Sequence, residues 1–161
     1  MAGLFSRRVQ AARAEIVGGP LAPEIRGWAY FRKVRGGTVV EVSVEGLPDY
    51  RPAVDGEDPI GPHGFHIHEF GTCQVGDAND PFQGAGDHYA PDGEPHGNHA
   101  GDLPVLFSNN GRAWMKVFTN RFDVEDVIDR TVIIHEHPND YRSQPAGAAG
   151  RRLACGVIRS L

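Results

Sequence analysis

The chain has 161 residues, 40% of them hydrophobic, which suits a single folded domain with a real core. Its formal net charge of −5 at pH 7 argues against general nucleic-acid binding but leaves room for a small anionic substrate. The 21 glycines and 12 prolines favour many turns over long helices, and no apolar stretch is long enough to span a bilayer.

The N-terminal segment contains a twin arginine, Arg7-Arg8, which is a feature of one class of export signal. Such a signal needs an apolar region next, whereas residues 11–15 include charged side chains. We therefore expect no export signal here. Residues 1–13 are predicted to form a mobile tail, and residues 14–161 a single domain.

Short segments with strand-like patterns open the predicted domain. Strands are expected at residues 14–17 and 25–34, and a turn at residues 35–37 leads into a third strand at residues 38–45. The third strand has one mostly apolar face, as expected of a sheet that is wet on one side. That face consists of Thr38, Val40, Val42 and Val44. Residues 49–62 are rich in proline and acidic side chains and are predicted to form a loop.

A histidine-rich strand follows, with the sequence HGFHIHEFG over residues 63–71. Apolar and polar residues alternate from Phe65 to His68, and successive side chains of a strand point to opposite faces. His66 and His68 therefore share one face, whereas His63 belongs with Phe65 on the other. Two imidazoles side by side on a rigid strand supply half of a metal site.

Residues 71–104 show no sustained periodicity and are dense in glycine, aspartate, asparagine, proline and histidine. A loop of this length inside a compact domain is usually functional or disordered. The histidines favour a functional loop, because a bound metal ion would order it.

The remainder of the chain returns to short strands. They are expected at residues 112–119, 131–135 and 153–158, with one helical turn at residues 123–128 and a second polar loop at residues 136–152. Short strands separated by turn signals predict an all-β sandwich or barrel.

Most of the eight histidines gather in the predicted loops and at strand ends, together with one aspartate. Imidazole with a carboxylate suits zinc or copper rather than calcium or magnesium. The residues alone therefore predict a metal site, but they do not say which ligands share which metal. The side chains concerned are His66, His68, His88, His96, His99, Asp102 and His135.

Six segments, in this order, resemble the copper/zinc superoxide dismutases. They are GFHIHEFG at 64–71, GDHYAP at 86–91, His96, HAGDL at 99–103, VIIHE at 132–136 and GRRLACGVI at 150–158. The resemblance extends from about residue 16 to residue 158.

The resemblance implies an all-β fold, an eight-stranded Greek-key β-barrel or flattened sandwich, with a long metal-binding loop and a second active-site loop. By motif position, one histidine would bridge a copper site and a structural zinc site. The implied copper ligands are His66, His68, His88 and His135. The implied zinc ligands are His88, His96, His99 and Asp102.

The implied enzyme is a superoxide dismutase, an antioxidant oxidoreductase that converts superoxide to oxygen and hydrogen peroxide while copper cycles between Cu(II) and Cu(I). His88 would leave copper on reduction and take up a proton, and Arg152 would attract the superoxide anion. The neighbouring Arg151 is interpreted as an ordinary surface cation. The family also makes a homodimer an expectation, and neither a nucleic-acid nor a membrane partner is expected.

The two cysteines, Cys73 and Cys155, are far apart in sequence. By themselves they leave open a pair of reduced buried thiols or a disulfide that closes a long loop. The resemblance implies the disulfide, which would tie the metal-loop region to the last strand. A disulfide points to an oxidising compartment, yet no export signal is visible, so the localisation stays undetermined, with the cytoplasm slightly favoured.

One position departs from the family pattern. Members usually carry an aspartate four residues after the last copper histidine, where it accepts ring N–H groups from a copper histidine and a zinc histidine. Here that position is Asn139, followed by Asp140. An amide has one acceptor end and one donor end, so it cannot accept from two imidazoles with both ends. Either a shifted loop brings Asp140 into place, or zinc binds more weakly than is usual in the family.

Two other functions compete with the dismutase. A non-enzymatic protein on the same barrel usually lacks a copper ligand or the active-site arginine, and a zinc hydrolase needs an open zinc position and a general base. All four copper histidines and Arg152 are present, and the zinc set leaves no open position, so the enzyme is favoured. Of the remaining histidines, His63 is interpreted as structural and His137 as a solvent-facing loop residue.

Overall fold

Eight antiparallel strands form one sheet within residues 9–161, the part of the chain that this computed structural model describes. The strands are β1 (Ala11–Gly18), β2 (Arg26–Val34), β3 (Gly37–Glu45), β4 (His63–His68), β5 (Asp102–Leu106), β6 (Ala113–Thr119), β7 (Thr131–His135) and β8 (Arg152–Ser160). Two short 3-10 helices, η1 (Gln83–Ala85) and η2 (Val124–Val127), lie in the connections.

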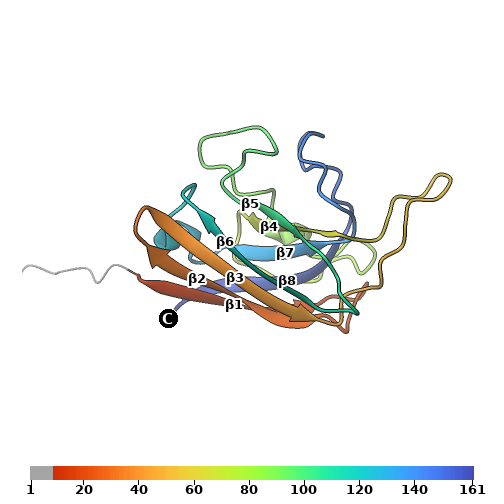
Figure 1. Ribbon diagram of the computed structural model, residues 1–161, viewed down its shortest axis with the longest axis horizontal. Helices are drawn as coiled ribbons and strands as arrows, with labels where there is room; N and C mark the ends of the chain where they lie inside the picture. The colour runs from red at the N-terminus through yellow and green to blue at the C-terminus, as the bar shows by residue number, and fades with distance from the viewer. Residues whose placement is uncertain (1–8) are drawn as a thin grey trace, which may run out of the picture.

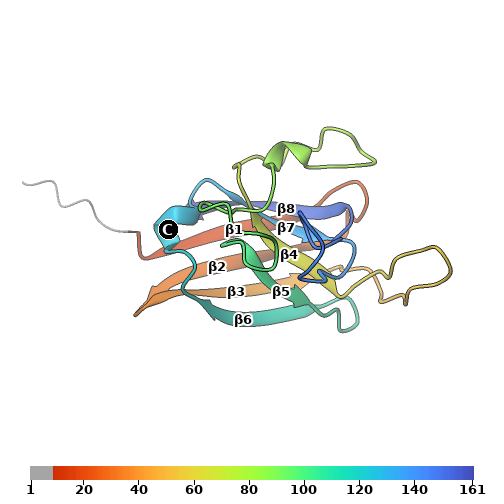
Figure 2. The ribbon, with the colours of Figure 1, turned by 90° about the horizontal axis from the view of Figure 1, so that it is seen from above.

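The sheet curls into a flattened, nearly closed barrel (Figure 1). Its strand order is β5-β4-β7-β8-β1-β2-β3-β6, and the connections β3–β4 and β6–β7 cross from one half of the sheet to the other. The edge strands β5 and β6 come near each other without a hydrogen-bonded ladder (Figure 2). The predicted all-β Greek-key architecture is therefore confirmed.

Alternating side chains fill the barrel. The predicted inner face of β3 is buried along its length, and Phe31 on β2 and Phe65 on β4 are fully buried. Strand β7 is buried on both faces because both are covered. Its Ile134 belongs to the barrel core, whereas Ile133 packs on the outside against Phe82 and the cysteine pair.

Strand β1 begins at Ala11, three residues before the expected start. Ala12 and Ala14 are fully buried there and alternate with exposed residues, but alanine carries little strand preference, so the sequence does not reveal the pattern. This moves residues 11–13 from the predicted tail into the sheet. Residues 1–8 lie outside the described residues, and the predicted mobility of the tail stays a prediction.

Strand β5 is not among the predicted strands, because its first three residues fall at the end of the segment predicted to be a loop, residues 71–104. It contains Pro104, which cannot donate to a ladder and is tolerated on an edge strand. The helical turn expected near residues 123–128 is present as η2.

Two long connections rise from the same half of the barrel (Figure 1). Residues 69–101 join β4 to β5, and residues 136–151 join β7 to β8. They cover the outer face of β4 and β7, where the histidines lie. Among the described residues, no helix is both long and apolar enough to cross a membrane.

Candidate metal centre

Strand β4 places the first two imidazoles. His66 and His68 point away from the barrel core, to which Phe65 and Ile67 on the same strand belong. Both histidines are nonetheless fully buried, because the long connections cover this face. His66 also lies opposite Asp102, the first residue of β5.

Two groups of side chains form around these histidines. Within each group, one ligand atom from every member lies within 4.8 Å of those of the others. The four-histidine group consists of His66, His68, His88 and His135. The carboxylate group consists of His88, His96, His99 and Asp102. His88 belongs to both, so the structure brings together every side chain that the sequence suggested as a ligand.

The rings of His68 and His135 point their Nε2 lone pairs at each other. His68 Nδ1 donates to the Gly86 carbonyl over 2.9 Å, and His135 Nδ1 donates to the Gly150 carbonyl over 3.3 Å. Each neutral ring therefore keeps its lone pair on Nε2. The two Nε2 atoms are 3.2 Å apart, a repulsive arrangement that a bound cation would relieve.

The carboxylate group is built around Asp102. Its Oδ1 lies 3.1 Å from His88 Nδ1 and 3.4 Å from His99 Nδ1, and its Oδ2 lies 3.4 Å from His96 Nδ1. Oδ2 also accepts the backbone N–H groups of Gly97 and His99. The carboxylate therefore both faces the three rings and holds the loop that carries two of them.

The donor atoms fit transition-metal ions. Five buried ring nitrogens lack a hydrogen-bond partner among the described residues, and four of them belong to the two groups: His66 Nδ1, His88 Nε2, His96 Nδ1 and His99 Nδ1. An unpartnered buried polar atom is expensive, and convergent imidazole nitrogens with one carboxylate are a donor set for copper or zinc. The rings of His66 and His96 are braced on their far side by Asn139, as metal-bound histidines usually are by a neighbouring polar group.

Burial sets the protonation of these side chains. Together with the neighbouring imidazoles, burial holds the pKa values of His66 and His68 well below their usual range and lowers that of His135 to about 3. Burial also lowers the pKa of His88, against the effect of its bond to Asp102. Burial alone would raise the pKa of Asp102, but the bond from His88 and the nearby histidines lower it overall. These are the protonation states in which the side chains bind metal.

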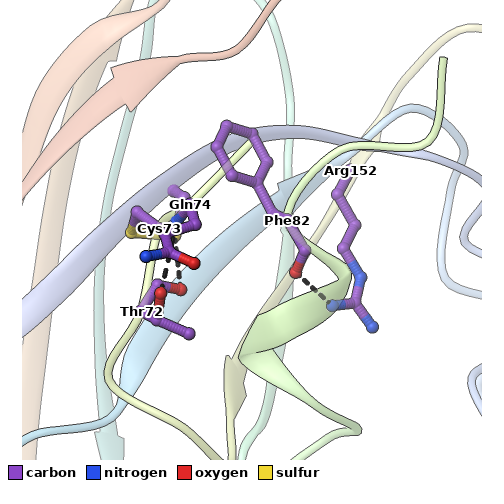
Figure 3. Close-up of a disulfide and its surroundings, with 6 residues drawn as sticks. Thr72, Cys73, Gln74, Phe82 and Arg152 are labelled. Atoms are coloured by element: carbon purple, nitrogen blue, oxygen red, sulfur yellow. Dashed lines mark hydrogen bonds between the residues drawn. A yellow bond between two sulfur atoms is a disulfide. The ribbon is translucent and has the colours of Figure 1, made fainter. Parts of the chain in front are cut away.

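Arg152 lies at the wall of a cavity of about 560 Å³ that the rings of His68, His88 and His135 also line. Its guanidinium is buried and donates to the Phe82 carbonyl over 2.7 Å (Figure 3). It also donates to the Gly86 carbonyl over 2.7 Å. Burial lowers the pKa of Arg152 from its usual value, but an arginine stays charged. The cavity therefore has a fixed cation beside the four-histidine group.

The disulfide between Cys73 and Cys155 is present, as the resemblance implied. It ties the start of the 69–101 connection to the centre of β8 (Figure 3). Phe82, whose carbonyl holds Arg152, packs against the same cysteine pair. The prediction of a bridge rather than two reduced thiols is confirmed.

Asn139, not Asp140, lies between the two groups. Its side chain is buried with one end 2.8 Å from His66 Nε2 and the other 2.7 Å from His96 Nε2. Asp140 is exposed and instead accepts from Ser143 and from the backbone of Arg142. The alternative in which a shifted loop brings in Asp140 is therefore wrong.

Sequence reasoning missed Gln144, because no motif marks it. Its amide contacts both backbone groups of His96: Oε1 accepts from the N–H over 2.9 Å and Nε2 donates to the carbonyl over 3.2 Å. The same connection approaches His96 through Gly147, where a Cβ atom would collide with the His96 ring and with Asn139. Residues 136–151 therefore hold His96 from two sides.

The remaining candidates take supporting positions. His63 Nδ1 donates to the His135 carbonyl over 2.8 Å, as a structural residue would. Arg151 pairs with Glu136 on the surface. His137 was expected to face solvent, and this is wrong: its side chain is largely covered and donates through Nδ1 to the Pro59 carbonyl over 2.9 Å.

Comparison with known proteins agrees with this geometry. The family model described as Copper/zinc superoxide dismutase (SODC) matches residues 25–158. The chain belongs to the copper/zinc superoxide dismutase family. A Cu-Zn superoxide dismutase of Deinococcus radiodurans is 35% identical over 156 residues, which cover 86% of this chain and 79% of that protein. A structure of Cu/Zn superoxide dismutase from Brucella abortus superposes with a TM-score of 0.73 at 27% identity, covering 92% of this chain and 99% of that one.

Membership of the copper/zinc superoxide dismutase family confirms the predicted enzyme class and the two cofactors, copper and zinc. The expected preference for the cytoplasm gains no support. An extracellular Cu-Zn superoxide dismutase of Rattus norvegicus is 32% identical over 150 residues, covering 86% of this chain and 57% of that protein. The disulfide is also a feature that persists in oxidising compartments.

Proposed function

We propose that this chain disproportionates superoxide with copper at the four-histidine group and zinc at the carboxylate group, the two being bridged by His88. The observation that carries this assignment is the double membership of His88. Its Nδ1 lies beside Asp102, and its Nε2 is buried without a partner on the side of the four-histidine group. A ring used at both nitrogens is what a two-metal bridge requires.

The donor types support this distribution of metals. Four imidazole nitrogens suit copper, which prefers nitrogen-rich tetragonal sites. Three imidazoles and one carboxylate are a closed zinc set without a position for water. The cavity is lined by His68, His88 and His135 of the first group, whereas His99 is its only lining residue that belongs to the carboxylate group alone. A redox metal in the first group would therefore meet its substrate there.

Copper, when bound, supplies the electron exchange by which two superoxide anions and two protons become one oxygen and one hydrogen peroxide. The chain supplies at least one proton position. His88 Nε2 faces the four-histidine group, and burial lowers the pKa of this ring. A ring with a lowered pKa releases a proton readily near neutral pH, so His88 is suited to hand a proton to the reduced substrate.

Arg152 attracts and orients the substrate anion. Its two carbonyl bonds fix the guanidinium at the cavity wall, so the charge is pre-organised rather than recruited. The cavity wall also contains Glu69 and Asp87, whose negative charges oppose an anion. Arg152 is therefore the cation on which approach of superoxide depends along this wall.

Metal analysis and a dismutase assay on the full chain test the proposal. We expect one copper and one zinc per chain, and superoxide dismutation that cyanide inhibits. In a His88→Ala variant, copper and zinc no longer share a ligand, so the magnetic signature of a bridged pair should disappear when cobalt replaces zinc. A chain that binds zinc alone and stays inactive after copper loading would refute the assignment.

Two further expectations accompany this function. We propose that residues 14–161 act as one catalytic domain, which residues 11–13 of β1 extend at its start. We also propose that two copies of the chain associate as a homodimer. Sedimentation velocity on the metal-loaded chain distinguishes a dimer near 35 kDa from a monomer of 17.5 kDa, the dimer mass being twice the mass of the chain.

A further inference from the structure

The amide of Asn139 has one possible orientation. One end of the side chain faces two nitrogens, the backbone N of Tyr141 at 2.8 Å and His96 Nε2 at 2.7 Å. A backbone N–H can only donate, so the atom that it faces must be the carbonyl oxygen Oδ1. The reverse orientation would set the amide N–H groups against the Tyr141 N–H. The amide nitrogen Nδ2 therefore faces His66 Nε2 at 2.8 Å.

This orientation imposes different tautomers on the two rings. A neutral imidazole has one N–H and one lone pair. His96 donates its Nε2–H to Oδ1, which leaves the Nδ1 lone pair facing Asp102, ready for a metal. His66 accepts from Nδ2 at its Nε2, which leaves its proton on Nδ1. That Nδ1 is the buried, unpartnered atom on the side of the four-histidine group.

We propose that Asn139 sets the metal preference of the centre, holding His96 ready for zinc and His66 in the tautomer that opposes copper. The proposal rests on the function proposed above. For His66 to bind through Nδ1, its proton must move to Nε2, where it would point at the amide N–H groups and the bond to Asn139 would be lost. The weakened metal is therefore copper, the opposite of the zinc weakening expected from the sequence.

No neighbouring group takes over from the amide. Among the described residues, Asn139 is the only hydrogen-bond partner of His66 Nε2, and the carboxylate of Asp140 is engaged at the surface by Ser143 and Arg142. A carboxylate at position 139 would accept from both rings at once. Support of this kind changes metal affinity by about 10–100-fold.

The tautomers can be measured in the full chain loaded with zinc only, from the nitrogen-15 chemical shifts of the histidine rings. We expect the His66 proton on Nδ1 and the His96 proton on Nε2. In Asn139→Asp, both protons should be on Nε2. Finding the wild-type His66 proton on Nε2 would overturn the proposal without any variant.

Competition titrations with chelators then measure copper and zinc affinities separately. Asn139→Asp should tighten copper by about 10–100-fold and zinc by clearly less. Asn98→Asp is the matched control, since it adds the same charge at an exposed position between two zinc ligands and should leave copper affinity unchanged. The proposal would be contradicted if Asn139→Asp bound zinc more tightly with unchanged copper affinity, or if both variants gained copper affinity equally. A wild-type chain that never binds copper would instead refute the proposed function and leave the tautomer result standing.

Discussion

The two kinds of ligand in this centre differ in what positions them. His66 and His68 on β4 and His135 at the end of β7 are placed by ladders of the barrel itself. His88, His96 and His99 lie in the 69–101 connection, which the disulfide, Asp102 and residues 136–151 hold in place. The barrel thus places three members of the four-histidine group on strands, whereas three of the four members of the carboxylate group lie in a connection that other contacts hold in place.

The largest effects should separate these two kinds of ligand. His135→Ala removes a ligand, so it should reduce copper affinity and activity more than the loss of a supporting hydrogen bond does, which costs about 10–100-fold. Amide exchange over residues 69–101 should change little. His99→Ala should weaken zinc and raise exchange throughout that connection. Hydrogen exchange with metal analysis measures both. An equal rise in amide exchange over residues 69–101 in both variants would contradict the distinction between strand-placed and loop-placed ligands.

Removing the disulfide should loosen the 69–101 connection, which carries His88, His96 and His99, more than it loosens the strands. A Cys73→Ser, Cys155→Ser double variant should lose about 2–5 kcal/mol of unfolding free energy. Denaturant titration measures the loss, and hydrogen exchange should place the new flexibility in residues 71–86 rather than in β4. A variant as stable as wild type would show that the bridge does not hold the loop.

The strand-borne histidines should make the metal-free protein acid-sensitive. The folded state holds the pKa values of His66 and His68 low and that of His135 at about 3, whereas unfolded histidine titrates near about 6.5. The unfolded state therefore binds more protons, and stability falls as pH drops from about 6.5 toward 3. Each such histidine contributes up to about 1.4 kcal/mol per pH unit. Urea titrations from pH 7 to 4 measure the slope, and a flat profile would contradict the burial.

The position of Arg152 depends on both the barrel and the 69–101 connection. Arg152 begins β8, but carbonyls of Phe82 and Gly86 in that connection orient its guanidinium. Arg152→Ile should lower activity by at least about tenfold and flatten its ionic-strength dependence, with both metals still bound. Arg151→Ile, a surface position paired with Glu136, is the control and should change neither. Salt dependence that persists without Arg152 would assign the attraction to other charges.

The strand-borne part of the centre could be predicted from residues, and the bracing of the loops could not. Alternation around Phe65 and Ile67 is enough to put His66 and His68 on one face, because the period of a strand is local. The double role of His88 came only through the resemblance, since no local pattern says which loop residue reaches two groups. Gln144 and the orientation of Asn139 depend on how residues 136–151 fold against His96, which is a tertiary contact.

The misplaced strand boundaries have a similar cause. β5 is short, contains Pro104 and lies at an edge, so neither composition nor alternation marks it. The buried alanines of β1 take their place from the neighbouring strands rather than from their own preference.

The bridging position of His88 is tested most directly by diffraction from the fully loaded protein at the copper and zinc absorption edges. The copper signal should lie among His66, His68, His88 and His135, and the zinc signal among His88, His96, His99 and Asp102, with the His88 ring between them. A single metal position, or two metals that do not share His88, would contradict the account.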